Sequence, residues 1–272
     1  MLNYKSDGGD QSQLNATINL PYILKSPIGL EANLSLFRKD STFSTTSQKI
    51  NLLYQISPHI TTGAGFQSIQ SENLQEIETL TDNSTDYTTN RFIASANYTK
   101  NQDNYFFPKK ATFSINTSLG NRETDIKERQ IGLEVEGSNA IVLNKKNSFF
   151  LKGVLRSLGS SNYVTNELYR FGGITSIRGF EENSIFANFL GTLNTEYRYV
   201  LNQSLYVHSL IDLAYFENDV TAQRAKLFSF GLGTGIRTKA GVLRVIIANG
   251  KNENQNFDFN NTKLHFQLAI RF

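Results

Sequence analysis

The sequence predicts an all-β fold, a transmembrane antiparallel β-barrel with about thirteen visible strands. Three observations predict it. Apolar and polar residues alternate along most of the chain in stretches about ten residues long, which suits a tilted bilayer crossing better than a soluble strand. Short turns alternate with longer polar loops, as on the two sides of an outer-membrane barrel. The face opposite the apolar one carries Asn, Thr, Ser, Gln, Glu and Arg, which suits a wet lumen.

Composition excludes several other classes of protein. The 272 residues contain no Cys, so neither a disulfide framework nor a thiolate metal site is expected, and the three His residues lie far apart. The 27 basic and 24 acidic residues are spread along the chain, so nucleic acid is not an expected partner. No apolar run approaches the roughly 18 residues that a membrane helix needs. The first residues show no signal peptide, so the chain is either cytoplasmic or a mature form or fragment.

The strands follow one another with only turns and loops between them, and no convincing helix appears. The alternating stretches are residues 14–22, 28–36, 50–56, 60–66, 92–98, 113–119, 131–135, 149–158, 189–201, 205–213, 228–236, 243–247 and 264–272.

The last of these stretches fixes which face meets lipid. Its apolar positions are Leu264, Phe266, Leu268, Ile270 and Phe272, opposed by Lys263, His265, Gln267 and Arg271. An arginine on the lipid side at the bilayer midplane would cost about 2–4 kcal/mol. The apolar set is therefore expected to face lipid.

One segment, ELYRFGGITSIRGFEEN at Glu167 to Asn183, differs from the rest. It has too many glycines for a helix and too little alternation for a strand, so it is expected to be a long, shaped loop. Arg178 lies between apolar Ile177 and aromatic Phe180, an unusual place for a charge exposed to water. A loop folded inward with a paired arginine would explain both features.

Within this segment, FGGITSIRGF at Phe171 to Phe180 resembles the signature of the BamA/TamA superfamily, the bacterial surface antigen type of outer-membrane barrel. The motif residues are Gly172, Gly173, Arg178, Gly179 and Phe180. Further segments that resemble the family are Asp103 to Ala111, Leu193 to Leu201, Val207 to Phe216, and the closing strand with its terminal Phe272. The sequence departs from the family at Ala111, where glycine is usual, and after Asp212, where Leu213 and Ala214 stand in place of the small residue and glycine often seen.

The resemblance implies a sixteen-strand barrel in the bacterial outer membrane, preceded by periplasmic POTRA domains. Residues 1–272 would be the barrel domain, lacking its first strands and any POTRA domains. The competing explanation is a short family member, with residues 1 to 6 supplying part of another strand. Implied partners are the lipid bilayer, client outer-membrane or secreted polypeptides, and POTRA domains or accessory lipoproteins. Phe272 would belong to the C-terminal signal by which barrels are recognised for assembly.

The strongest candidate site joins Arg178, Glu196 and Asp212. The two carboxylates fall on the polar registers of successive strands, so both are expected to point into the lumen. The planar guanidinium of an arginine on the loop can bind carboxylates bidentately. The alternative is three separate solvated charges.

A second candidate is the face of the late strand that carries Gly231, Gly233 and Gly235. Glycines on one face of a strand usually mean that another backbone lies close, and the folded-in loop is the expected neighbour. The alternative is a lumen that the missing side chains simply widen.

Catalysis is not expected. Ser209 faces away from His208 and Asp212 in a strand, and the chain has no GxSxG or HExxH motif, so catalytic residues, metal and cofactors are all absent from the prediction. Three functions stay open. They are insertion or assembly of outer-membrane proteins, export of a polypeptide by two-partner secretion, and a passive pore or structural barrel that anchors a missing N-terminal domain.

Overall fold

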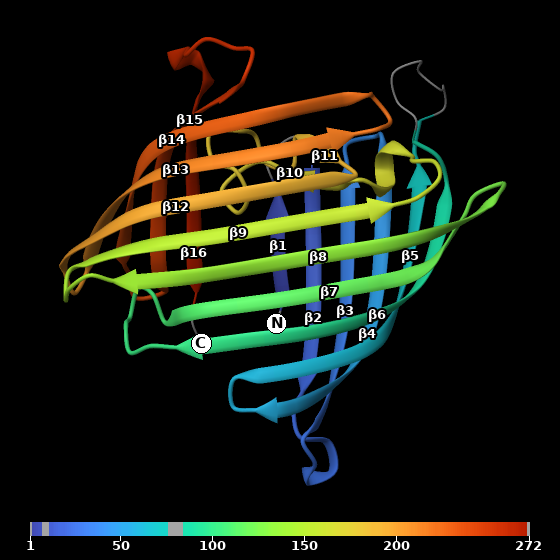
Figure 1. Ribbon diagram of the computed structural model, residues 1–272, viewed down its shortest axis with the longest axis horizontal. Helices are drawn as coiled ribbons and strands as arrows, with labels where there is room; N and C mark the ends of the chain where they lie inside the picture. The colour runs from blue at the N-terminus through green and yellow to red at the C-terminus, as the bar shows by residue number, and fades with distance from the viewer. Residues whose placement is uncertain (1, 7–10, 76–83, 271–272) are drawn as a thin grey trace. The chain divides into compact units, whose positions relative to one another are not determined.

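Fourteen antiparallel strands dominate the computed structural model, which describes residues 2–6, 11–75 and 84–270. Hydrogen bonds join them in the order β1-β2-β3-β4-β5-β6-β7-β8-β9-β12-β13-β14-β15-β16 (Figure 1). Their bounds are β1 Leu2–Ser6, β2 Gln11–Leu20, β3 Ile28–Lys39, β4 Phe43–Ser57, β5 Ile60–Asn73, β6 Tyr87–Asn101, β7 Lys109–Glu123, β8 Lys127–Val142, β9 Asn147–Gly159, β12 Phe189–Asn202, β13 Leu205–Asn218, β14 Gln223–Arg237, β15 Gly241–Asn252 and β16 Thr262–Ile270. All of them except β1 lie on stretches predicted from alternation.

Three short 3-10 helices complete the described secondary structure, η1 Ile23–Lys25, η2 Thr165–Glu167 and η3 Phe259–Asn261. No helix in the described ranges is long and apolar enough to cross a membrane.

The chain divides into two compact units. The first comprises Met1–Tyr98, Ser114–Glu134 and Ser157–Leu168, and it contains the paired strands from β1 through the start of β6. The second comprises Thr99–Phe113, Val135–Arg156 and Tyr169–Phe272, and it contains the ladder from β12 to β16. In this ladder Asn194 pairs with Asp212, which in turn pairs with Ser229, so polar residues on three successive strands share one face.

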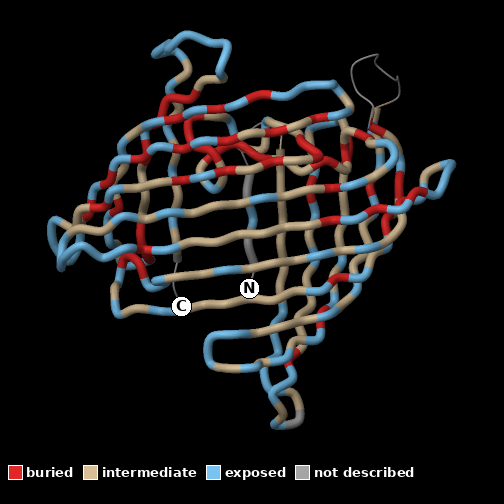
Figure 2. Tube along the Cα trace, viewed as in Figure 1, coloured by how far each residue is buried: buried red, intermediate tan, exposed pale blue. Residues whose placement is uncertain are grey.

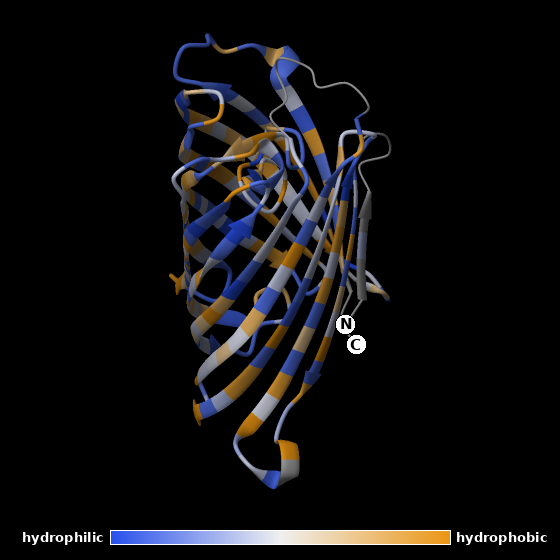
Figure 3. Cartoon of the chain, turned by 90° about the vertical axis from the view of Figure 1, so that its right-hand side faces the viewer, coloured by the Kyte–Doolittle hydropathy of each residue, from blue (hydrophilic) through white to orange (hydrophobic). Residues whose placement is uncertain are grey.

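Alternation in the sequence becomes alternation in burial. In β13, Val207 and Ile211 are 40% and 57% exposed, whereas His208, Leu210 and Asp212 are buried. Figure 3 shows the same pattern as hydrophobic and hydrophilic bands along the strands. In β16 the side chains of Leu264, Phe266 and Leu268 are exposed as predicted for the lipid face. The Ile270 side chain and Phe272 lie outside the described residues.

The long loop, residues 160–188, connects β9 to β12. The expectation that it contains no strand is wrong. Its limbs pair as β10, Tyr169–Phe171, and β11, Ile185–Ala187. Three-residue strands are too short to show a period, which is why alternation missed them. The loop carries buried Phe171 and Ile177, and both pack with the inner faces of β12 to β14, where Figure 2 shows burial.

Candidate functional site

Arg178, at the tip of the long loop, is buried against two carboxylates of the second unit. Its backbone N and its Nε donate to Asp212 Oδ2 at 3.0 and 2.8 Å, and Nη2 donates to Asp212 Oδ1 at 2.5 Å. Nη1 donates to Glu196 Oε1. The side chains of Arg178 and Asp212 are 5% and 0% exposed, so the pair is held away from water. The structure therefore brings together the three residues that the sequence singled out, and we call them the loop latch.

The glycines of the motif let the chain turn back on itself here. The φ angles are 114° at Gly172, 87° at Gly173 and 84° at Gly179. Residues with a side chain rarely adopt such positive angles. The turn is closed by the Gly172 amide, which donates to Ser176 Oγ at 2.8 Å, and by the Gly173 amide, which donates to the Ile177 carbonyl at 3.0 Å. The turn thus points the Arg178 side chain at β12 and β13.

Burial by itself lowers the pKa of Arg178, but its hydrogen bonds and charge contacts with Asp212 and Glu196 outweigh this effect, so the pKa is raised. The guanidinium is charged at every physiological pH. The latch consequently contains a charged arginine paired with carboxylates.

Glu196 links the latch to a second arginine. Its Oε2 accepts from Arg198 Nε at 2.7 Å. The Arg198 guanidinium lies between two rings, 4.2 Å from the centre of Phe107 and 3.9 Å from that of Phe150. Phe107 comes from the Asp103 to Ala111 segment, so this segment supports the latch through Arg198. Arg198 lies two residues after Glu196 and so shares its polar register, but no sequence pattern indicates the ring contacts.

The last strand also holds the loop, through residues to which the sequence assigned no role. His265 Nε2 in β16 accepts from the Gly179 amide at 3.0 Å, which requires that nitrogen to be unprotonated. Lys263 Nζ donates to Glu181 Oε1 at 2.7 Å. The sequence pattern does place both residues on the inward face of β16. It does not show that the loop lies beside them, because that contact forms only when the chain folds.

The prediction that the loop packs against the glycine face of β14 is wrong. A side chain at Gly231 would strike the β15 backbone at Ile247, and one at Gly233 or Gly235 would strike the rings of His208 or Tyr206. These glycines therefore make room for neighbouring strands and their bulky side chains. The loop approaches a different glycine, Gly250 of β15, which lies against Gly179 and Phe180.

The segment before β10 has its own buried ion cluster, in the first unit. Arg122 at the end of β7 pairs with Glu128 of β8 and with Glu167 of η2, where the distance from Nη1 to Oε1 is 2.5 Å. Gln130 Nε2 donates to Glu167 Oε2 at 2.7 Å. Burial raises the pKa of Glu167 above its ordinary value, in opposition to Arg122.

Neighbouring Asn166 is buried too. It donates from Nδ2 to Ser71 Oγ and to the Thr85 carbonyl, both at 2.8 Å, so η2 is fixed to β5 and to the segment before β6.

Comparison of the sequence with models of protein families identifies the family of this chain. The Omp85 superfamily domain matches residues 3–272, nearly the whole chain. The chain belongs to the Omp85 superfamily. It is thus an outer-membrane protein of bacteria with an antiparallel barrel fold, and the Omp85 barrels are not enzymes. No curated protein matches the sequence.

Solved structures agree with this Omp85 assignment at the level of fold. BamA from Haemophilus ducreyi, crystallised without POTRA domains 1–3, is 17% identical with a TM-score of 0.68, and the match covers 97% of this chain and 62% of that one. CdiB from Acinetobacter baumannii is 12% identical with a TM-score of 0.56, and the match covers 92% of this chain and 55% of that one. The chain therefore spans less than two thirds of either relative.

Proposed function

We propose that this Omp85 barrel assists the insertion or assembly of other proteins at the outer membrane. The observation that supports the proposal is the latch, in which a loop tip from within the second unit is held by charge-assisted hydrogen bonds to two strands. Such a contact keeps the loop in one place without catalysing a reaction. In the proposed function it holds the strands in the arrangement that an incoming strand meets.

The implied partners follow from this role. The clients are unfolded outer-membrane polypeptides, which pair with an exposed sheet edge by β-augmentation. We further propose that residues 1–272 are the barrel domain of a longer protein, with POTRA domains or accessory lipoproteins as additional partners. No nucleotide is required, because strand pairing and lipid burial drive insertion.

Export of a polypeptide is the second candidate, favoured by the fold similarity to CdiB. In that case the loop would occupy the path of an extended chain, and release of Arg178 would open it. A passive pore or structural barrel is the third.

Reconstitution in liposomes tests the proposal. An unfolded eight-stranded barrel is added as client, and its folding is followed by heat-dependent migration on gels. We expect the 272-residue chain to accelerate client folding over protein-free liposomes and Arg178→Ala to remove most of the acceleration. Arg224→Ala, which changes an arginine at a strand end that is 67% exposed, is the matched control. If neither the wild type nor Arg224→Ala makes the client fold faster than in protein-free liposomes, the proposed function is contradicted.

The exporter reading makes a different prediction in the same liposomes. An unfolded soluble polypeptide would enter the vesicles and become protected from added protease, and Arg178→Ala would change the rate. Passage of ions alone, with neither client folded nor polypeptide protected, would indicate a passive pore.

A further inference from the structure

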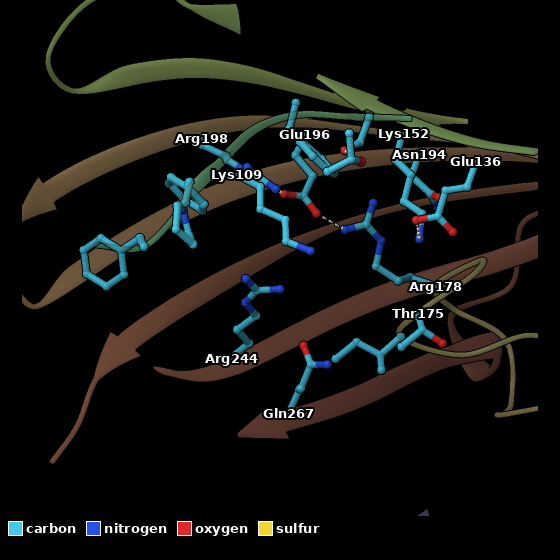
Figure 4. A pocket seen from close by; sticks show the side chains of 17 residues that line it. Lys109, Glu136, Lys152, Thr175, Arg178, Asn194, Glu196, Arg198, Arg244 and Gln267 are labelled. Atoms are coloured by element: carbon cyan, nitrogen blue, oxygen red, sulfur yellow. Dashed lines mark hydrogen bonds and ion pairs between the residues drawn. The ribbon is translucent and has the colours of Figure 1, made fainter. Parts of the chain in front are cut away.

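A cavity of about 410 Å³ lies beside the latch, within the second unit. Residues from β7, β8, β9, β12, β15 and β16 line it, and Thr175 of the long loop forms part of one side (Figure 4). Its volume lies within the range typical of small-molecule pockets. Phe106, Phe107 and Phe150 supply apolar wall, and charged and amide groups supply most of the rest.

The charges in this cavity do not balance. The cations that line it are Lys109, Lys152, Arg178, Arg198 and Arg244. Three of them have acidic partners. Lys152 pairs with Glu136 at 3.1 Å, and Arg178 and Arg198 both pair with Glu196. Within the described part of the chain, Lys109 and Arg244 form no ion pair.

One of these two cations also has an unsatisfied polar atom. Arg244 Nε is buried and has no hydrogen-bond partner among the described residues, although such groups almost always have one. Arg244 does contact the Tyr206 hydroxyl, but this partner is neutral. Figure 4 shows the ends of Lys109, Arg244 and Gln267 directed into the same space.

We propose that this cavity is a binding site for an oxyanion, a phosphate or carboxylate group of a small molecule, held by Lys109 and Arg244. The guanidinium of Arg244 offers paired donors to two oxygens, and the ammonium of Lys109 adds a point charge from the facing strand. Gln267 contributes an amide donor, and the phenylalanine rings exclude water from one side. The inference is independent of client insertion, because Lys109 and Arg244 are not part of the latch.

The chemistry favours an anion with at least two oxygens over a simple halide. A halide cannot use the paired donors of a guanidinium, whereas phosphate and carboxylate match their geometry. Pyrophosphate is a suitable probe because it carries such groups, is compact enough for the cavity and absorbs no light. Binding is expected to weaken steeply with salt, since ions screen both charges.

Titration calorimetry of the full chain in a neutral detergent tests the site. We expect saturable binding of pyrophosphate, and a Kd at least tenfold higher for the double variant Lys109→Gln/Arg244→Gln. The control is Lys110→Gln/Lys239→Gln, which removes the same formal charge from an adjacent strand position and an exposed turn and should leave the Kd unchanged. Heat-dependent gel migration establishes that each variant is folded. Equal affinities for the two double variants, or no saturation with the wild type, would overturn the proposal.

A labelling experiment tests the local charge without a ligand. The chain has no Cys, so Lys109→Cys and Lys110→Cys each introduce a unique thiol. We expect the ratio of the anionic to the cationic methanethiosulfonate rate to be several-fold higher at position 109 than at position 110, because Arg244 still lines the cavity beside position 109. Equal ratios at the two positions would contradict an anion site.

Discussion

Asp212 is the residue on which the loop latch depends most. It is fully buried, and among the described residues it accepts three hydrogen bonds, all of them from Arg178. A buried carboxylate that loses its partner typically destabilises a protein by about 3–5 kcal/mol. Glu196 differs, because Arg198 still neutralises it when Arg178 is removed. Loss of Arg178 would therefore leave Asp212 without a cationic partner but would leave Glu196 paired with Arg198.

The geometry of the guanidinium predicts the outcome of replacing Arg178 by lysine. A lysine keeps the charge but cannot bind Asp212 bidentately and Glu196 at the same time. We expect Arg178→Lys to release the loop partly and Arg178→Ala to release it fully, each with the strands still formed. Limited proteolysis between residues 159 and 187 measures the release. Full loop protection in both variants would show that the ion pair does not hold the loop.

Gly179 provides a second test with a change of one methyl group. Its φ of 84° disfavours any side chain, and a Cβ would collide with the Gly250 backbone of β15. Gly179→Ala should move the loop from β15 and speed proteolysis by an order of magnitude or more, from an expected cost of about 1–3 kcal/mol in strain. Gly191→Ala is the control, because a Cβ there meets nothing within 4 Å. Equal protection of the two variants would contradict this account.

At the scale of elements, η2 is predicted to be fastened separately from the loop tip. Arg122→Met leaves Glu128 and Glu167 as two buried carboxylates without their cation, so we expect residues 157–168 to become sensitive to protease. Lys127→Met, which removes an exposed ion pair at the same hairpin, should change little. Mass spectrometry of the first cleavage products distinguishes this site from the loop tip.

The strands could be predicted well from the sequence, and the loop only in part. Alternation over ten residues is a strong signal, so β2 to β9 and β12 to β16 were all found. Arg178, Glu196 and Asp212 were found because a motif and two strand registers converge on them. The His265 contact spans 86 residues and the Arg122 pair with Glu167 spans 45, and no local pattern encodes such distances. The glycine face misled because glycine signals a close neighbour without saying which one.

At the scale of the whole molecule, the outward apolar faces predict how charge is tolerated. Leu232 of β14 is 68% exposed on the face assigned to lipid, and Ile236 lies on the same face, one residue before the end of the strand. Leu232→Arg should destabilise the protein in bilayers by about 2–4 kcal/mol, and Ile236→Arg by about 0–1 kcal/mol. Urea unfolding in lipid vesicles measures both. Equal costs would contradict the assigned depth.

The contact between Gly179 and His265 joins the tip of the long loop to the last strand. β16 ends the strand order, and among the described pairings its ladder partner is β15. Because the loop donates to this strand as well as to β13, we expect separation of β16 from β15 and withdrawal of the loop to be coupled. Amide hydrogen exchange at Gly179 and along β16 should then proceed at matching rates, and a polypeptide that engages β16 would accelerate exchange at the loop tip from a distance.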